Sequence, residues 1–190
     1  EIPIGLALLI PVLVVGSLHI GDIVGWQGDH RWLILHSPFA FIAFFIYFIS
    51  GVAEANRAPF DIPEAESELV AGWMTEYSGF RWSLFFLAEY ANIILIAALT
   101  SIFFLAGWSS PFEGWSILNE DSLLRQPSFF WFALKTCFFI FVFFWIRATF
   151  PRYRYDQIMR LGWKIFIPVT IVWIAVEGLM AWMKIGPWSV

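Results

Sequence analysis

The sequence predicts an all-α, polytopic transmembrane helix bundle, and three observations lead to that class. Hydrophobic residues make up 60% of the 190 residues and charged residues only 14%, against about 25% charged residues in soluble domains. The mean hydropathy is +0.74. The apolar residues also form long runs, and a helix needs about 20 such residues to cross the hydrocarbon core. This composition excludes a disordered chain, a nucleic-acid-binding domain and a secreted domain built on disulfides.

Five apolar runs define the predicted membrane spans, which cover residues 2–21, 32–53, 82–108, 129–146 and 165–183. Strands of a membrane barrel would be about 9–11 residues long and would alternate in polarity, so helices are favoured. We treat residues 1–190 as a single membrane domain. Because the chain opens on Glu1, without an initiator methionine or a basic leader, we expect it to be a piece of a longer polypeptide.

Two charged linkers orient the predicted spans. The acidic linker, residues 54–81, contains six acids and two arginines, whereas the basic linker, residues 147–164, contains five basic residues and one acid. An odd number of spans separates adjacent linkers, so these two lie on the same side of the membrane. That side holds seven lysines and arginines and the other side holds three. The positive-inside rule therefore predicts that both linkers are cytoplasmic or face the equivalent organellar compartment.

Closely spaced carboxylates are the main feature of the acidic linker. Asp61 and Glu64 have the spacing of a capping box, and a short amphipathic helix is predicted over residues 62–75. Glu64, Glu66 and Glu68 alternate along it. In one interpretation they simply stabilise the start of that helix. In the other they hold or pass protons beside the bilayer, because mutual repulsion raises the pKa of clustered carboxylates.

A second set of acids lies at or just inside span ends that face the same side: Glu1, Glu54 and Glu89. Ionisable groups in a membrane are costly and suggest a function. The structural alternative for each is snorkelling or a buried ion pair. Lys135 and Glu177 are the charges on the last two spans. An interhelical pairing, with each other or with another partner, is at least as reasonable for them as a relay.

Basic side chains at Arg147, Arg152 and Arg154 follow the fourth span. They either anchor the chain to anionic headgroups or dock against an acidic surface, which is the acidic linker or a partner subunit. The three histidines lie near the first two spans and none follows residue 82, which argues against a bis-histidine haem. With one cysteine, Cys137, no disulfide framework or cysteine-based metal site can form within the chain.

Two long motifs resemble signatures of one protein family. The first is residues 54–79, EANRAPFDIPEAESELVAGWMTEYSG, and the second is residues 147–159, RATFPRYRYDQIM, followed by GWK at 162–164. Together they resemble the membrane subunit of respiratory complex I that is known in mitochondria as NADH dehydrogenase subunit 1, and its bacterial homologue. The resemblance covers essentially the whole chain. That family has eight transmembrane helices, and this chain is similar to the last five.

The resemblance implies a role for each charged group. The family assigns a chain of glutamates leading from the quinone cavity into the membrane arm to the positions of Glu1, Glu54 and Glu89. The acidic loop beside the quinone cavity corresponds to Arg57, Asp61, Glu64, Glu66 and Glu68. The basic loop near the peripheral arm corresponds to Arg147, Arg152 and Arg154.

The resemblance also implies the function: a quinone-site membrane subunit of proton-translocating NADH–quinone oxidoreductase, which is not catalytic alone. Quinone would be a substrate, no cofactor would be bound covalently, no metal would be held, and flavin and iron–sulfur clusters would be on partner subunits. Its partners would be the quinone-module and neighbouring membrane subunits, quinone and the lipid bilayer. It would be a multi-pass protein of the bacterial inner membrane, or of the mitochondrial inner membrane if organellar.

Three alternatives stay open at this point. One is the homologous membrane subunit of an energy-converting hydrogenase, which uses no quinone. Another is a non-catalytic membrane anchor for a soluble oxidoreductase, in which the buried glutamates could be neutralised without loss of turnover. The third is an independent transporter, for which the charge pairs of this chain look incomplete.

Overall fold

The computed structural model describes residues 1–30, 32–61, 76–112 and 126–183, and in these ranges the chain is helical without any strand. The fold class predicted from the sequence, an all-α helix bundle, is therefore confirmed. The elements are α1 (Ile2–Val15), α2 (Ile20–Asp29), α3 (Leu33–His36), α4 (Pro38–Glu54), α6 (Phe80–Phe104), α7 (Phe129–Thr149), α8 (Tyr155–Met159), the π-helical segment η2 (Arg160–Phe166) and α9 (Ile167–Met183).

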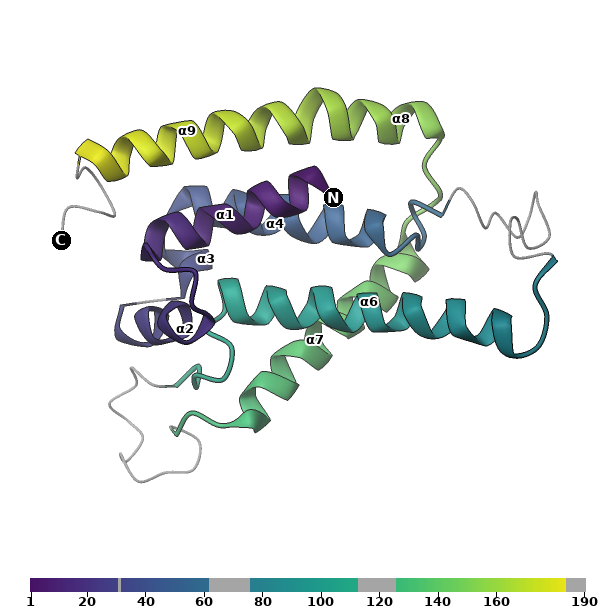
Figure 1. Cartoon of the computed structure of the whole chain (residues 1–190), viewed down its shortest axis with the longest axis horizontal. Helices are drawn as coiled ribbons and strands as arrows, with labels where there is room; N and C mark the ends of the chain where they lie inside the picture. The colour runs from purple at the N-terminus through teal and green to yellow at the C-terminus, as the bar shows by residue number, and fades with distance from the viewer. Residues whose placement is uncertain (31, 62–75, 113–125, 184–190) are drawn as a thin grey trace.

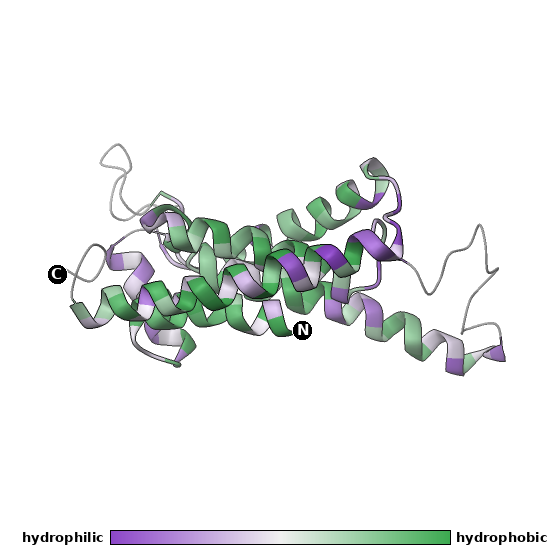
Figure 2. Cartoon of the chain, turned by 90° about the horizontal axis from the view of Figure 1, so that it is seen from above, coloured by the Kyte–Doolittle hydropathy of each residue, from purple (hydrophilic) through white to green (hydrophobic). Residues whose placement is uncertain are grey.

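The long helices pack side by side, with α7 crossing α6 obliquely (Figure 1). α1 packs against both α4 and α9, and α6 packs against α4 and α7. α8, η2 and α9 follow one another without a break and form one long helix above α1. Apolar residues cover most of each long helix, whereas hydrophilic residues gather around α8 and the beginning of α6 (Figure 2). This is the pattern of helices that cross a bilayer with polar ends.

Three of the described helices are long and apolar enough to cross a membrane: Phe80–Phe104, Phe129–Thr149 and Tyr155–Met183. They correspond to the third, fourth and fifth predicted spans. α1 and α2 add a fourth only if this pair, bent by 59°, counts as one span, and α4 is a shorter apolar helix of 17 residues. The number of five crossings therefore stays a prediction. The amphipathic helix expected over 62–75 lies outside the described residues.

The first two predicted spans are not continuous helices, and local backbone chemistry explains both breaks. α1 ends at Val15 because Gly16 adopts the left-handed conformation, φ 73°, which favours glycine at a helix end. α2 then begins after His19, whose side chain accepts a hydrogen bond from the Gly21 backbone N–H. In the second run, Ser37 precedes Pro38 and is extended, as residues before proline tend to be. That break separates α3 from α4.

α4 lies at the centre of the bundle, and its contact with α6 is very close. A Cβ atom added at Gly51 would lie 2.6 Å from Cγ2 of Ile96, so a glycine is needed for this approach. Phe48 on α4 meets Phe139 and Phe143 of α7, with ring centroids 5.6 and 5.0 Å apart. This aromatic contact joins α4 to α7. The end of α4, which carries Glu54, is thereby held against the rest of the bundle.

Candidate functional site

A cavity of about 580 Å³ opens where the beginning of α1, the end of α4 and the segment η2 meet. Two acids, Glu1 and Glu54, line it, and its other walls are apolar or aromatic residues except for Ser50 and Asn56. These walls are Ile2, Pro3, Ile49, Ser50, Ala53, Asn56, Phe60, Ile158, Met159, Leu161, Gly162, Trp163, Phe166 and Ile167. We call it the carboxylate cavity. Its size and composition are those of a site for a largely apolar ligand oriented by a few polar groups.

The antiparallel packing of α1 and α4 brings the two acids together. Glu1 stands at the N-cap of α1 and Glu54 is the last residue of α4, so both lie at the same end of the bundle (Figure 1). Both residues are exposed. A negative charge is favoured at the start of a helix and disfavoured at its end. The two carboxylates therefore share the cavity but differ in their helical surroundings.

The π-helical segment η2 forms the third wall of the cavity. Leu161, Gly162, Trp163 and Phe166 of this segment all line it. A π-helical turn holds an extra residue, and such turns often occur at functional sites within longer helices. Here the wider turn falls at the cavity wall, between the charged α8 and the apolar α9.

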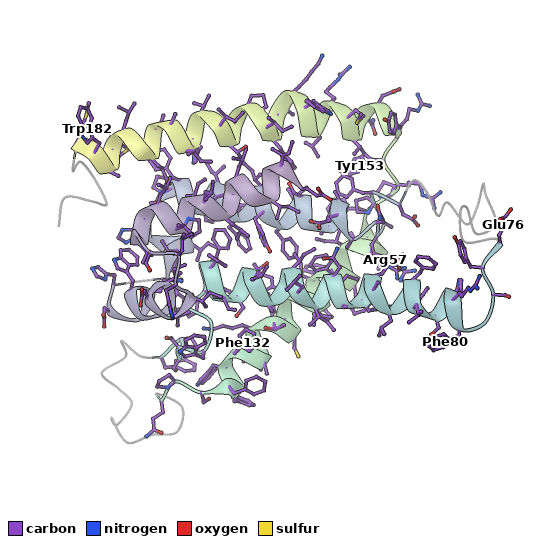
Figure 3. All side chains as sticks on the ribbon, in the orientation of Figure 1. Arg57, Glu76, Phe80, Phe132, Tyr153 and Trp182 are labelled. Atoms are coloured by element: carbon purple, nitrogen blue, oxygen red, sulfur yellow. The ribbon has the colours of Figure 1, made fainter. Side chains whose placement is uncertain are left out.

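Glu89 does not line the carboxylate cavity but forms an ion pair with Arg57. Arg57 Nη2 donates to Glu89 Oε2 at 2.6 Å, and the two side chains are 11% and 14% exposed. The guanidinium also stacks over the rings of Phe86 and Tyr90. The distance from Arg57 Cζ to the ring centroid is 5.2 Å in both cases. Figure 3 labels Arg57 beside α6. The structure thus places Glu89 in the ion pair that its structural alternative expects, and its role in a relay stays a prediction.

Arg57 connects the ion pair to the cavity through the backbone of the acidic linker. Its neighbour Asn56 lines the carboxylate cavity, as does Phe60 three residues later. The structure therefore brings Glu1 and Glu54 to one cavity and places Glu89 behind its wall, on the other side of the chain segment that carries Arg57. Asp61 is half-buried in the same segment. Glu64, Glu66 and Glu68 lie outside the described residues, and their cluster stays a prediction.

The acidic and basic linkers touch where each can be described. The Tyr153 backbone N–H donates to the Pro59 carbonyl at 2.9 Å, and the Tyr153 and Phe60 rings have centroids 5.5 Å apart. Figure 3 shows Tyr153 between α8 and the end of α4. This contact joins the two linkers through a backbone hydrogen bond and a ring pair, and both interpretations of the basic side chains stay predictions.

The predicted basic residues around that contact are exposed. Arg147 lies in the last turn of α7, where a cation is favoured by the helix dipole, and with Arg57 and Tyr90 it lines a small cavity of about 10 Å³. Arg152 and Arg154 are exposed too. The backbone N–H of Arg154 donates to Gln157 Oε1 at 3.2 Å and so helps to begin α8.

Lys135 binds backbone carbonyls and makes no hydrogen bond to Glu177. Its ammonium donates to the carbonyl oxygens of Leu105, Gly107 and Ser109, at 2.6, 3.1 and 2.7 Å. It also lies 5.0 Å from the centroid of a Trp32 ring. These carbonyls close the end of α6, where helical backbone acceptors lack partners. Lys135 thus holds this end of the bundle together through backbone acceptors.

Gln27 is a buried residue that sequence reasoning missed. It is 1% exposed; its Nε2 donates to the Ile102 carbonyl at 3.0 Å, and its Oε1 accepts from the Ala106 N–H at 2.9 Å and the Leu33 N–H at 3.2 Å. It ties α2 and α3 to the end of α6. A single glutamine in a polar stretch gives no pattern from which this role could be predicted.

The fold and the site define a class: a multi-pass helical membrane protein with acidic groups at one end of its bundle. The comparison with known families makes the class specific. The family model described as NADH dehydrogenase matches residues 1–178, and the chain belongs to this family, the NADH dehydrogenase subunit 1 family of complex I. It is a membrane subunit of a complex I-type enzyme and assembles with other subunits of it. The resemblance seen in the two motifs is thereby confirmed.

Proposed function

We propose that this subunit binds quinone in the carboxylate cavity and couples quinone reduction to proton translocation through Glu1, Glu54 and Glu89. The observation that carries the proposal is the cavity itself: about 580 Å³, mostly apolar and aromatic walls, and two carboxylates. Quinones combine an apolar ring and tail with two carbonyl oxygens that become hydroxyls on reduction. Such a ligand suits apolar walls with nearby proton donors.

The reduction needs electrons and protons from different sources. In this proposal the electrons come from iron–sulfur clusters on partner subunits, which receive them from NADH through a flavin held elsewhere in the enzyme. This chain supplies the apolar walls and the acids. Glu1 and Glu54 exchange protons near the quinone head, so each turnover changes the charge at the end of α4.

A change of charge in the cavity acts next on the Arg57–Glu89 ion pair. Arg57 lies between cavity-lining residues of its own segment and Glu89 on α6. A new negative charge in the cavity attracts the guanidinium and weakens its hold on Glu89, whereas neutralisation of a cavity acid does the reverse. The ion pair is thus an element whose equilibrium the quinone site biases. Glu89 then takes up or releases a proton toward the membrane arm.

Filling the cavity tests the proposal directly. Ala53 lines the cavity on α4, so Ala53→Phe should occupy space that the quinone needs. We expect NADH–quinone reductase activity to fall at least about tenfold, equivalent to about 1.4 kcal/mol of lost transition-state binding. Electron transfer from NADH to a soluble acceptor that does not use the quinone site should persist. The measurement is both activities in native membranes, normalised to assembled enzyme.

Ala91→Phe is the matched control, because Ala91 is exposed on α6 and does not line the cavity. It adds the same ring on another helix, outside the cavity walls. Unchanged quinone reductase activity in Ala53→Phe, with normal assembly, would contradict the proposal. The dependence on quinone also separates this function from the alternative of an energy-converting hydrogenase subunit.

A further inference from the structure

Glu177 is a fully buried acid that neither the carboxylate cavity nor the ion pair uses. It is 0% exposed, and neither of its carboxyl oxygens has a hydrogen-bond partner among the described residues. Ile167, at the beginning of α9, lines the carboxylate cavity. Glu177 follows ten residues later and is therefore about 15 Å further along α9, at 1.5 Å per residue. An ionised carboxylate without partners is strongly disfavoured in an apolar interior.

Within the part of the chain that the structure describes, the helices packed against α9 bring no positive charge to Glu177. α9 packs against α1 and α4, neither of which contains a basic residue; their titratable groups are Glu1, Tyr47 and Glu54. Among the described residues of its own long helix, the nearest cation is Lys164, thirteen residues earlier and about 20 Å away along the axis. At the end where α4 begins, the imidazole of His36 packs edge-on against Trp26, with centroids 4.9 Å apart.

The nearest side-chain donor on the same face of α9 is not engaged either. Trp173 lies one helical turn before Glu177 and packs against Phe39 of α4, with ring centroids 5.0 Å apart. Its indole Nε1 is buried without a hydrogen-bond partner among the described residues. An ionised carboxylate one turn away would attract this N–H. A partner subunit cannot supply a counter-charge by surface contact, because no part of Glu177 reaches the surface of this chain.

We propose that Glu177 is a second proton-binding site, in which a neutral carboxylic acid is buried where α9 packs against the bundle, separate from the cavity acids. The ligand is a proton, which needs no additional space. The proposal is independent of quinone binding, because it concerns the protonation state of one side chain. Exchange of this proton requires the packing of α9 against the bundle to open, because the carboxyl group is fully buried.

Infrared spectroscopy of the assembled enzyme tests this directly. We expect the difference between the wild type and Glu177→Gln at neutral pH to show one band of a protonated carboxylic acid carbonyl, which moves to lower frequency in deuterated water. The Gln variant should assemble to the wild-type level, because an amide matches a neutral acid in volume and charge. Glu76→Gln is the matched control: Glu76 is exposed (Figure 3), and its loss should remove carboxylate bands instead.

Three results would overturn the proposal. One is a loss of carboxylate bands in Glu177→Gln, which would mean that the acid is ionised, for example because the N-terminus of α4 stabilises its negative charge. Another is a spectrum without any carboxyl difference. The third is failure of Glu177→Gln to assemble, because the structure would then depend on the charge. None of these results bears on quinone binding, so they are distinguishable from a failure of the function proposed above.

Discussion

Replacing Glu89 by Gln is the sharpest perturbation of the coupling route, because it removes the proton site and keeps the shape. The Arg57–Glu89 contact is 2.6 Å long and mostly buried, so solvent screens it little. A hydrogen bond to a charged group contributes about 1.5–3 kcal/mol and a neutral one about 0.5–1.5 kcal/mol. The change therefore weakens the pair by about 1–1.5 kcal/mol, or about tenfold in its equilibrium. The stacking of Arg57 on Phe86 and Tyr90 remains, so the subunit should still assemble.

The assay is quinone-linked proton uptake in membrane vesicles, normalised to assembled enzyme, alongside NADH oxidation by a soluble acceptor. If Glu89 carries a proton, proton uptake should be highest in the wild type, lower in Glu89→Asp and lowest in Glu89→Gln. Asp can still bind and release a proton, although its side chain is one methylene shorter than the contact with Arg57 needs. In the Gln variant we expect uptake to fall by more than tenfold. The reasoning is refuted if Glu89→Gln pumps as well as the wild type, or better than Glu89→Asp. That order would identify a structural ion pair.

Two further predictions concern packing and topology. Gly51→Val should reduce assembly, because its Cβ meets Ile96 at 2.6 Å and overpacking costs about 1–3 kcal/mol of stability. The amount of assembled enzyme is measured by native electrophoresis, and Gly5→Val, at a position with open space, is the control that should assemble normally. Equal assembly of both variants would contradict the packing argument. In a Cys137→Ser background, an impermeant thiol reagent applied to intact cells should label Gln126→Cys but not Ser78→Cys. The reason is that the residues around Ser78 belong to the linker predicted to be cytoplasmic. The opposite labelling pattern would show that the chain crosses the membrane in the opposite orientation.

The sequence was sufficient for features that depend on composition and on neighbours in the chain. The runs over 82–108, 129–146 and 165–183 predicted α6, α7 and α9, because a bilayer demands long apolar helices. The breaks at Gly16 and at Ser37–Pro38 also depend on local signals, a glycine and a proline. They were missed because both runs are apolar throughout, and hydropathy does not register a helix end inside a span.

Contacts between distant residues could not be predicted in the same way. The sequence placed Glu89 just inside a predicted span, where a charge is costly, but did not show that Arg57, 32 residues away, is its partner. That pairing depends on how the end of α4 packs on α6. Lys135 donates to three backbone carbonyls, which every residue carries and no side-chain pattern marks. The meeting of Glu1 and Glu54 in one cavity depends on the antiparallel packing of their helices.

The attachment of α6 at one end has a mechanical consequence. Gln27 and Lys135 hold the segment from Ile102 to Ser109, whereas Phe80 and Leu87, near the other end, are 77% and 66% exposed. α6 is also held at Ile96 by its close contact with Gly51, so its freer arm begins there, and Glu89 lies about 10 Å from that pivot at 1.5 Å per residue. A tilt of about 6° would move Glu89 by about 1 Å. That displacement is enough to stretch a 2.6 Å contact beyond hydrogen-bonding distance, so a small rotation of one helix can break the contact between Arg57 and its acid.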